Sequence, residues 1–246
     1  MPWSHKYLEV VRSLDLNMAK DRRATLILDR MIKKEDTARL EALIRDRPAI
    51  IYGCGPSLEN DVNKIWESGV HSRCVNVAVD GAVKALLQYN ITAHINVTDL
   101  DGDLPSIVKA NHLGCITMVH AHADNIKTVV RVMPHLKGTV FGTTHSIPTD
   151  KVHNFGGFTD GDRAVHIVEH FKPAFIVLAG MDFGRVIGVY SGVFDPVKKP
   201  RGLMVGKRII EELAAHTRTR IFNVTSSGDN IHNVKPITID RLKHVI

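Results

Sequence analysis

Seven short apolar segments alternate with helical patterns along most of the chain, and this alternation constrains the fold more than any other feature of the sequence. The segments are residues 48–53, 74–79, 93–98, 115–120, 139–143, 174–180 and 220–225. Most are rich in Val and Ile at successive positions, as expected for strands that are covered on both faces. Helical spacing of apolar residues follows at about 58–68, 81–89, 103–112, 124–135, 160–171 and 203–217. Together they predict an α/β fold, with a doubly wound, mostly parallel sheet flanked by helices.

The first 46 residues have a different pattern and are predicted to form a helical N-terminal extension. Apolar residues recur there with helical spacing among many charged ones, and Arg47-Pro48 ends the region. We therefore expect a helical extension at 1–46 and an α/β domain at 47–246. Residues 184–202 hold six glycines or prolines and are predicted to be a long loop, a kind that often serves as a lid or binding loop.

Size and composition narrow the class of protein. The chain has 246 residues, 44% of them hydrophobic, which suits one globular domain with a small extension. No apolar stretch approaches the roughly 20 residues that a membrane helix needs, and three cysteines without a CxxC motif suggest reduced thiols in the cytoplasm. The net charge of +6 allows an anionic partner, but only 6% of the residues are aromatic, which argues against nucleic acid.

Ligands of open α/β sheets bind at the carboxyl ends of the strands, and acidic residues gather at those ends in this sequence. In NVTDLDGD, residues 96–103, Asp99, Asp101 and Asp103 occupy alternate positions after an apolar segment. Alternate side chains of an extended segment project the same way, so the three carboxylates are expected to converge and to need a cation. Mg²⁺ prefers such oxygen ligands together with substrate phosphates. The simpler alternative is an acidic turn in which Asp103 caps the next helix.

Polar residues follow the other predicted strands as well. The two glycines of GCGPS, residues 53–57, permit either a phosphate-binding turn or an ordinary tight turn, with Ser57 capping the next helix. Asp80 either caps a helix or adds a carboxylate to this edge. The H-x-H sequence that ends at His122 lacks identifiable further ligands for zinc. Asp182 lies in a DFG triplet without the other kinase motifs, and it can bind a polar ring or a metal.

A second glycine-containing loop precedes the fifth predicted helix. Thr159 and Asp162 have the spacing of a capping box, which leaves Asp160 without an assigned partner. Gly156 and Gly157 would let a nucleotide approach the helix N-terminus, where the partial positive charge favours phosphate.

Taken together, these motifs resemble the archaeal 6-hydroxymethyl-7,8-dihydropterin pyrophosphokinases. The resemblance covers about residues 48–230 and rests on YGCGPSLE, VAVDGA, VTDLDGD, HAHADN, FGGFTDGDRA and AGMDFG in that order. A more distant likeness is to thiamine pyrophosphokinases. One position departs from the family pattern, since Ala123 stands where glycine is favoured.

The resemblance implies an enzyme that uses ATP and Mg²⁺ to transfer diphosphate to the hydroxymethyl group of a reduced pterin, with release of AMP, in folate or methanopterin biosynthesis. Carried over to this sequence, Asp99 and Asp101 match the acidic motif, with Asp80 and Asp160 as supporting carboxylates. Combining the resemblance with the strand-end residues, we expect catalytic roles for Asp99, Asp101 and Asp160, metal binding by Asp80, Asp99 and Asp101, phosphate binding by Gly53, Gly55, Ser57, Gly156, Gly157 and Thr159, and substrate binding by Asp80, His122 and Asp182.

Two other functions fit the same motifs. One is a glycosyltransferase of the related group that transfers nonulosonic sugars, because its G-x-G-P-S loop is similar and its nucleotide-sugar site also binds metal through carboxylates. The other is a non-catalytic nucleotide-binding module. In every case we expect small-molecule ligands and no membrane attachment, and residues 1–46 can serve as an added helical layer or as the contact of a homo-oligomer.

Overall fold

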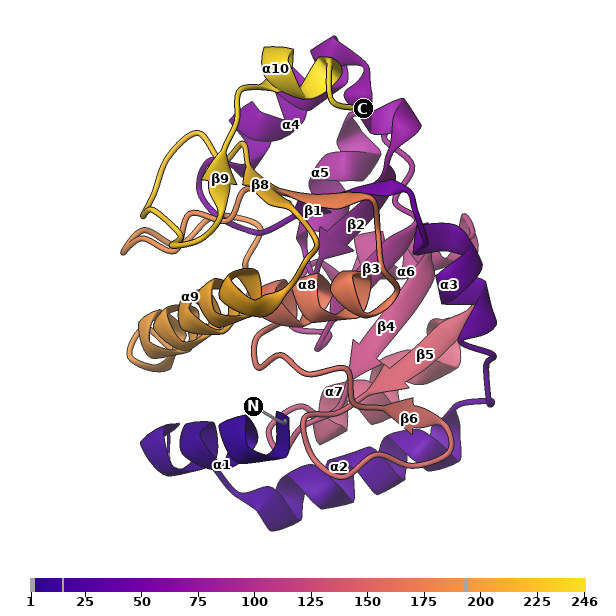
Figure 1. Cartoon of the computed structure of the whole chain (residues 1–246). Coiled ribbons are helices and arrows are strands. Elements are labelled where there is room, and N and C mark those ends of the chain that lie inside the picture. Colours follow the sequence, from indigo (N-terminus) through magenta and orange to yellow (C-terminus); the bar gives the residue numbers. More distant parts are fainter. Residues whose placement is uncertain (1–2, 15, 193) are drawn as a thin grey trace.

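The computed structural model describes residues 3–14, 16–192 and 194–246, and a nine-stranded parallel sheet lies at the centre of this part of the chain (Figure 1). The strands lie in the order β6-β5-β4-β3-β2-β1-β7-β8-β9, and every neighbouring pair is parallel. Their bounds are β1 Pro48–Tyr52, β2 Val75–Val79, β3 Ile95–Thr98, β4 Ile116–His120, β5 Val140–Thr143, β6 Val152–His153, β7 Phe175–Ala179, β8 Ile221–Asn223 and β9 Lys235–Pro236.

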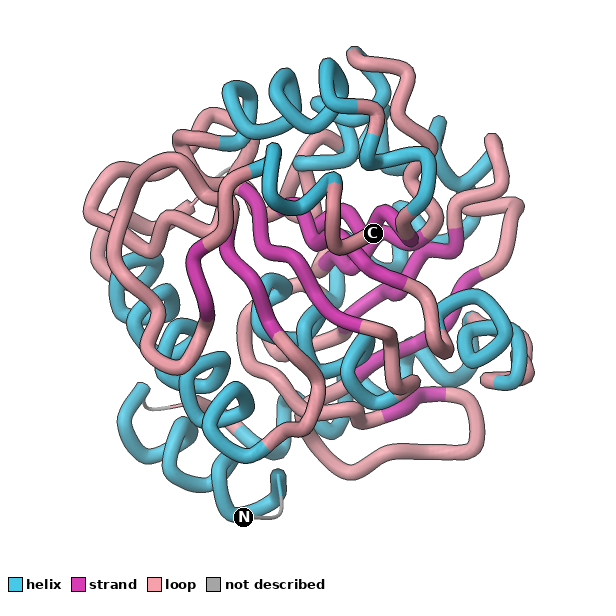
Figure 2. Tube along the Cα trace, turned by 45° about the horizontal axis from the view of Figure 1, so that its top comes forward, coloured by secondary structure: helices cyan, strands magenta, loops and turns pink. Residues whose placement is uncertain are grey.

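Helices cover both faces of the sheet (Figures 1 and 2), which confirms the predicted α/β fold. One face packs against α2, α4, α5, α6, α7 and α10, and the other against α3, α8 and α9. The ten α-helices of the described residues are α1 Trp3–Leu14, α2 Met18–Met31, α3 Ala38–Ile44, α4 Leu58–Ser68, α5 Ala82–Gln88, α6 Leu104–His112, α7 Ile126–Val132, α8 Asp160–His170, α9 Lys198–His216 and α10 Ile239–Lys243. None of them combines the length and the apolarity needed to cross a membrane.

All seven predicted strands are present, each within two residues of its expected bounds. The edge strands β6 and β9 were not predicted, because a two-residue strand has no periodicity to detect. Helix α9 begins at Lys198 and not near residue 203, because Pro200 lies in the first turn, where its missing N–H has no intrahelical partner to lose. The predicted loop at 184–202 therefore ends at Val197, and residue 193 within it lies outside the described residues.

The topology brings distant parts of the chain to one edge of the sheet. Because all strands are parallel, the loops after β2 and β3 emerge side by side at the carboxyl edge. Helix α8 packs across β1, β2 and β3, and this course carries its first residue, Asp160, to the same edge.

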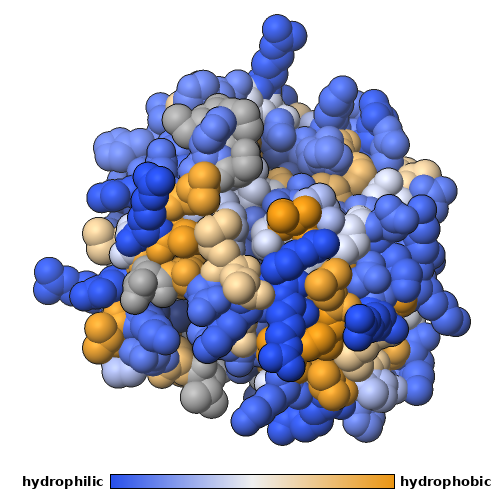
Figure 3. Space-filling view, turned by 90° about the horizontal axis from the view of Figure 1, so that it is seen from below, coloured by the Kyte–Doolittle hydropathy of each residue, from blue (hydrophilic) through white to orange (hydrophobic). Residues whose placement is uncertain are grey.

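The N-terminal helices contribute to the two apolar cores that lie on either side of the sheet. Leu28 of α2 and the following Ile32 belong to one core, and Leu40 and Ile44 of α3 belong to the other. Figure 3 views the molecule from below, the side on which α1 and α2 lie in Figure 1, and hydrophilic side chains cover most of that face. The region is helical as predicted, and a domain boundary at residue 46 stays a prediction.

Leu28→Ala should lower the free energy of unfolding by about 2–5 kcal/mol, because it removes a fully buried side chain from a packed core. Chemical denaturation followed by circular dichroism measures the loss. Leu26→Ala is the matched control, since Leu26 lies on the same helix and is 40% exposed. An equal loss in both variants would contradict the shared core.

Candidate active site

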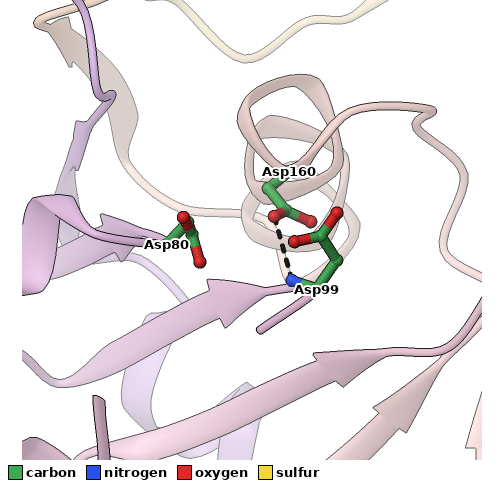
Figure 4. Close-up of side chains that lie close together, drawn as sticks. All are labelled: Asp80, Asp99 and Asp160. Carbon is green, nitrogen blue, oxygen red and sulfur yellow. Dashed lines mark hydrogen bonds between the residues drawn. The ribbon is translucent and has the colours of Figure 1, made fainter. Parts of the chain in front are cut away.

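Three carboxylates from three elements meet at the carboxyl edge of the sheet (Figure 4). Asp80 follows β2, Asp99 follows β3 and Asp160 begins α8, and one oxygen atom of each lies within 4.8 Å of the others. The backbone N–H of Asp99 donates a hydrogen bond to Asp160 Oδ2 at 3.0 Å. The three side chains therefore face a common space between α8 and the strand ends.

Asp80 is held by the loop that follows β3. Its Oδ1 atom accepts a hydrogen bond from Thr98 Oγ1 at 2.6 Å and another from the backbone N–H of Gly102 at 3.2 Å. A side chain at position 102 would collide with the Asp80 carboxylate, so glycine lets this loop close around Asp80. Asp80 itself has φ 44°, a left-handed conformation that aspartate tolerates better than most residues.

Asp99 is contacted by the loop after β4. His122 Nε2 lies 3.4 Å from Asp99 Oδ2, and Asn125 Nδ2 donates a hydrogen bond to the Asp99 carbonyl at 2.7 Å. Of the two histidines in the H-x-H motif, His122 faces the acidic cluster, whereas His120 is 2% exposed and points into a buried network.

Repulsion between like charges governs the electrostatics of this cluster. Burial and the charge of Asp99 raise the pKa of Asp80 and of Asp160. Asp101 lies at the solvent side of the cluster. Partial desolvation and the charges of the other three carboxylates raise the pKa of Asp101 to about 10. Burial also opposes ionisation of Asp99, but the hydrogen bond and charge of His122 outweigh it and lower the Asp99 pKa. The carboxylates therefore oppose one another's ionisation, and a cation bound between them would favour the ionised forms.

Arg163 is a cation that the chain itself brings to the cluster. It is 2% exposed, and one of its nitrogens donates to Asp160 Oδ1 at 2.6 Å. One guanidinium does not neutralise three carboxylates, so the arrangement fits a divalent cation. The donors are all carboxylate oxygens, as Mg²⁺ prefers, and their 4.8 Å spread is near the roughly 4.2 Å between opposite ligands of that ion.

The loop after β3 is not extended, contrary to the expectation that Asp99, Asp101 and Asp103 converge. Leu100 has φ 68°, which turns the chain away from a strand conformation. Asp103 caps α6 by accepting a hydrogen bond from the third residue of the helix, and it pairs with Lys84 at 3.1 Å. Asp101 stays beside the cluster, where its N–H donates to Asp99 Oδ1 at 3.2 Å. The cap alternative is therefore correct for Asp103 alone.

Close packing against the chain after β7 explains why the loop after β1 contains glycines. The N–H groups of Gly53 and Gly55 donate to carbonyl oxygens at the end of β7 and beyond it, each at 2.8 Å. A side chain at Gly55 would collide with Asp182. These N–H groups are therefore engaged within the protein, and phosphate binding by Gly53, Gly55 and Ser57 stays a prediction.

Ser57 and Asp182 belong to a buried network that sequence reasoning did not find. Ser57 Oγ lies 2.8 Å from Asp182 Oδ2 and 2.9 Å from Asp61 Oδ2, and Ser227 also donates to Asp182. The Ser57 hydroxyl is thus within hydrogen-bond distance of both carboxylates, and burial raises the pKa of Asp61. This network ties together the loops after β1, β7 and β8, and substrate binding by Asp182 stays a prediction.

The loop before α8 contains the predicted capping box. The Asp162 carboxylate accepts a hydrogen bond from the backbone N–H of Thr159 at 2.8 Å, which confirms the box. Gly157 has φ 86° and packs against the backbone of Arg163, where a side chain would collide. Phosphate binding by Gly156, Gly157 and Thr159 stays a prediction.

Part of the predicted long loop lies over the acidic site. Gly192, at φ 65°, packs on the carbonyl of Asp101, where a side chain would collide. A cavity of about 440 Å³ opens beside this contact. Its lining consists of Lys84, Gln88, Asp101, Gly102, Asp103, Val189, Tyr190 and Gly192.

A chain of buried histidines lies behind His122, and no local sequence pattern indicates it. His145 Nε2 lies 3.0 Å from Asp21 Oδ2, and His145 Nδ1 lies 3.2 Å from His120 Nε2. His120 Nδ1 is 3.2 Å from Thr143 Oγ1. Burial lowers the pKa of both histidines. Burial therefore favours the neutral form of both rings.

His120→Gln should flatten the dependence of stability on pH. The folded-state pKa of His120 lies well below 6.5, so below about pH 6.5 the unfolded chain binds a proton that the folded chain does not. This contribution to stability is present at pH 7 and is lost as the pH falls. The variant should reduce the slope of unfolding free energy between pH 7 and 5 by up to about 1.4 kcal/mol per pH unit.

Urea unfolding at several pH values measures this slope. His232→Gln is the control, because His232 is exposed. An unchanged slope in the His120 variant would contradict a neutral buried imidazole.

The fold and the site define an α/β protein with an acidic cluster at the carboxyl edge of its parallel sheet, and comparison with known proteins adds the family. The family model described as "6-hydroxymethylpterin diphosphokinase MptE-like" matches residues 24–188. The chain belongs to this MptE-like family.

Two curated relatives are similar along most of their length. A 6-hydroxymethyl-7,8-dihydropterin pyrophosphokinase of Methanothermobacter thermautotrophicus is 35% identical over 228 residues, which cover 89% of this chain and 97% of that protein. A protein of the same name from Methanocaldococcus jannaschii is 37% identical over 199 residues, 77% of this chain and 82% of that protein.

A solved structure shares the fold. The MAf glycosyltransferase from Magnetospirillum magneticum AMB-1 matches with a TM-score of 0.57 and 15% identity, over 91% of this chain and 39% of that chain. At this identity the similarity shows the fold alone.

Proposed function

We propose that this chain is a 6-hydroxymethyl-7,8-dihydropterin pyrophosphokinase. It transfers diphosphate from ATP to the pterin hydroxymethyl group, with release of AMP, and acts in the cytoplasm in tetrahydrofolate or tetrahydromethanopterin biosynthesis. The names of the curated relatives support the reaction. The structural observation that carries the proposal is the meeting of Asp80, Asp99 and Asp160 at the carboxyl edge of the sheet.

The reaction joins the hydroxymethyl oxygen to the β-phosphorus of ATP. The bond between that phosphorus and the oxygen leading to the α-phosphate breaks, AMP leaves, and the hydroxyl proton is released. Charge develops on phosphate oxygens, so the protein's main tasks are positioning and neutralisation. Mg²⁺, when bound, supplies positive charge to the phosphates and orients them.

The chain's own residues prepare the site for this chemistry. Asp80, Asp99 and Asp160 offer the oxygen ligands, and Asp101 adds a carboxylate at the solvent side. Arg163 fixes Asp160 through its hydrogen bond. The neighbouring cavity of about 440 Å³ is of the size that small-molecule ligands occupy, and Asp101 forms part of its wall.

The remaining candidate residues surround this centre. His122 can contact substrate beside Asp99. The loop before α8, which contains Gly156 and Thr159, can approach phosphates at the start of that helix. Binding through Gly53 and Gly55 would require their N–H groups to leave the carbonyls that they now contact.

Asp101→Asn should reduce turnover by at least about a hundredfold without unfolding the protein. The side chain is exposed, so the fold tolerates the amide, but an amide cannot ionise to offer negative charge to a cation bound beside the phosphates. Single-turnover AMP release measures the effect. Asp150→Asn is the control, since Asp150 is also exposed and lies outside both the acidic cluster and the lining of the cavity. Near-normal AMP release by the Asp101 variant would remove this residue from the site.

Incubation with ATP, Mg²⁺ and 6-hydroxymethyl-7,8-dihydropterin should yield AMP and a pterin diphosphate in equal amounts, measured by chromatography. AMP formation should require the pterin. Nucleotide release from a sugar donor, without pterin-dependent AMP, would instead indicate a glycosyltransferase. Nucleotide binding without either product would indicate a binding module.

A further inference from the structure

Helix α2 brings a buried carboxylate, Asp21, to the loop after β4. Asp21 is 3% exposed, and three groups surround its two oxygens. The backbone N–H of Ala123 donates to Oδ1 at 2.8 Å, the Tyr7 hydroxyl donates to Oδ2 at 2.8 Å, and His145 Nε2 lies 3.0 Å from Oδ2. Burial opposes ionisation of Asp21, but the close contact with His145 and the hydrogen bonds from Tyr7 and Ala123 outweigh it and lower the Asp21 pKa.

The loop that Asp21 holds is the one that contacts Asp99. Within it, the N–H of His122 donates to Asn125 Oδ1 at 2.9 Å. Asn125 Nδ2 in turn donates to the carbonyls of Asp99 and His120, each at 2.7 Å. His122 Nε2 faces the Asp99 carboxylate at 3.4 Å. Ala123 lies between His122 and Asn125 in the sequence. The backbone of this short loop therefore connects the hydrogen bond of Asp21 to the contacts with Asp99.

We propose that Asp21 is a positioning residue of the acidic site. It fixes loop 121–125, and through His122 and Asn125 it keeps Asp99 in the geometry that binds a divalent cation. The N-terminal helices are thereby part of the site's supporting structure. The consequence for turnover rests on the proposed function, whereas the effects on the loop and on cation binding do not.

Contacts other than those of Asp21 also hold α2 against the sheet. Ala24 and Leu28 are buried in the core, and Asp29 Oδ1 accepts a hydrogen bond from Thr149 Oγ1 at 2.6 Å at the far end of the helix. Asp29 makes its contact away from loop 121–125. Variants at Asp21 and at Asp29 can therefore test the positioning of the loop separately from the attachment of the helix.

Asp21→Ala in the full chain tests the proposal by two readouts that need no catalysis. Hydrogen exchange of segment 121–125 should become at least about tenfold faster, because the Ala123 N–H loses its partner. The dissociation constant for Mn²⁺, used as a paramagnetic probe and measured by EPR, should rise at least about fivefold. If the proposed activity exists, the Mg²⁺ concentration for half-maximal rate should rise in parallel.

Two matched variants separate positioning from simple destabilisation. Asp29→Asn should leave loop exchange and Mn²⁺ affinity unchanged. Asp21→Asn keeps an oxygen for the Ala123 N–H, so it should restore most of the loop protection and of the Mn²⁺ affinity. If Asp21→Ala does not fold, Tyr7→Phe replaces it, and smaller changes of the same sign are expected.

The proposal is overturned if loop exchange or Mn²⁺ affinity in the Asp21→Ala variant equals that of the wild type, or if Asp29→Asn shows the same changes. Failure of the proposed function appears differently, as wild-type protein that forms no pterin-dependent AMP while its loop and cation readouts still respond to Asp21.

Discussion

The repulsion between carboxylates at the edge of the sheet is the constraint on which the rest of the site depends. Asp80, Asp99 and Asp160 come from three separate elements, and the ionised form of each carboxylate would have a lower free energy farther from the other two. The surrounding structure compensates in part, since Arg163 pairs with Asp160 and Thr98 donates to Asp80. The fold thus maintains an arrangement that its own charges disfavour, which is typical of a site completed by a cationic ligand.

The strands and the edge at which the acidic residues gather could be predicted from the sequence, because both follow from short-range patterns. Apolar segments mark the strands, and the parallel arrangement then places the residues after β2 and β3 together. The position of Asp103 could not be derived in this way. It depends on the left-handed backbone conformation of Leu100, and leucine, unlike glycine or asparagine, does not indicate that conformation in a sequence.

Residues that act across long distances in the sequence were missed. In the sequence, Asp21 and Asp61 each lie in the first turn of a helix, where an acidic residue is explained by its favourable interaction with the helix dipole. Only the tertiary fold shows that Asp21 accepts a hydrogen bond from the Ala123 N–H and that Asp61 accepts one from the Gly180 N–H. The glycine motifs illustrate the reverse case, since Gly55 suggests a phosphate turn but is also required by close packing against a neighbouring loop.

The sequence separation of these contacts bears on the order in which the molecule assembles. Asp99 and Asp160 are 61 residues apart, and Asp21 and Ala123 are 102 residues apart. The pairs β1–β2 and β2–β3 join strands that are near neighbours in the chain, whereas closing longer loops costs more entropy. We expect a folding chain to form this part of the sheet before its carboxylates gather. A cation that binds the gathered carboxylates therefore stabilises only chains that have completed the late steps of folding.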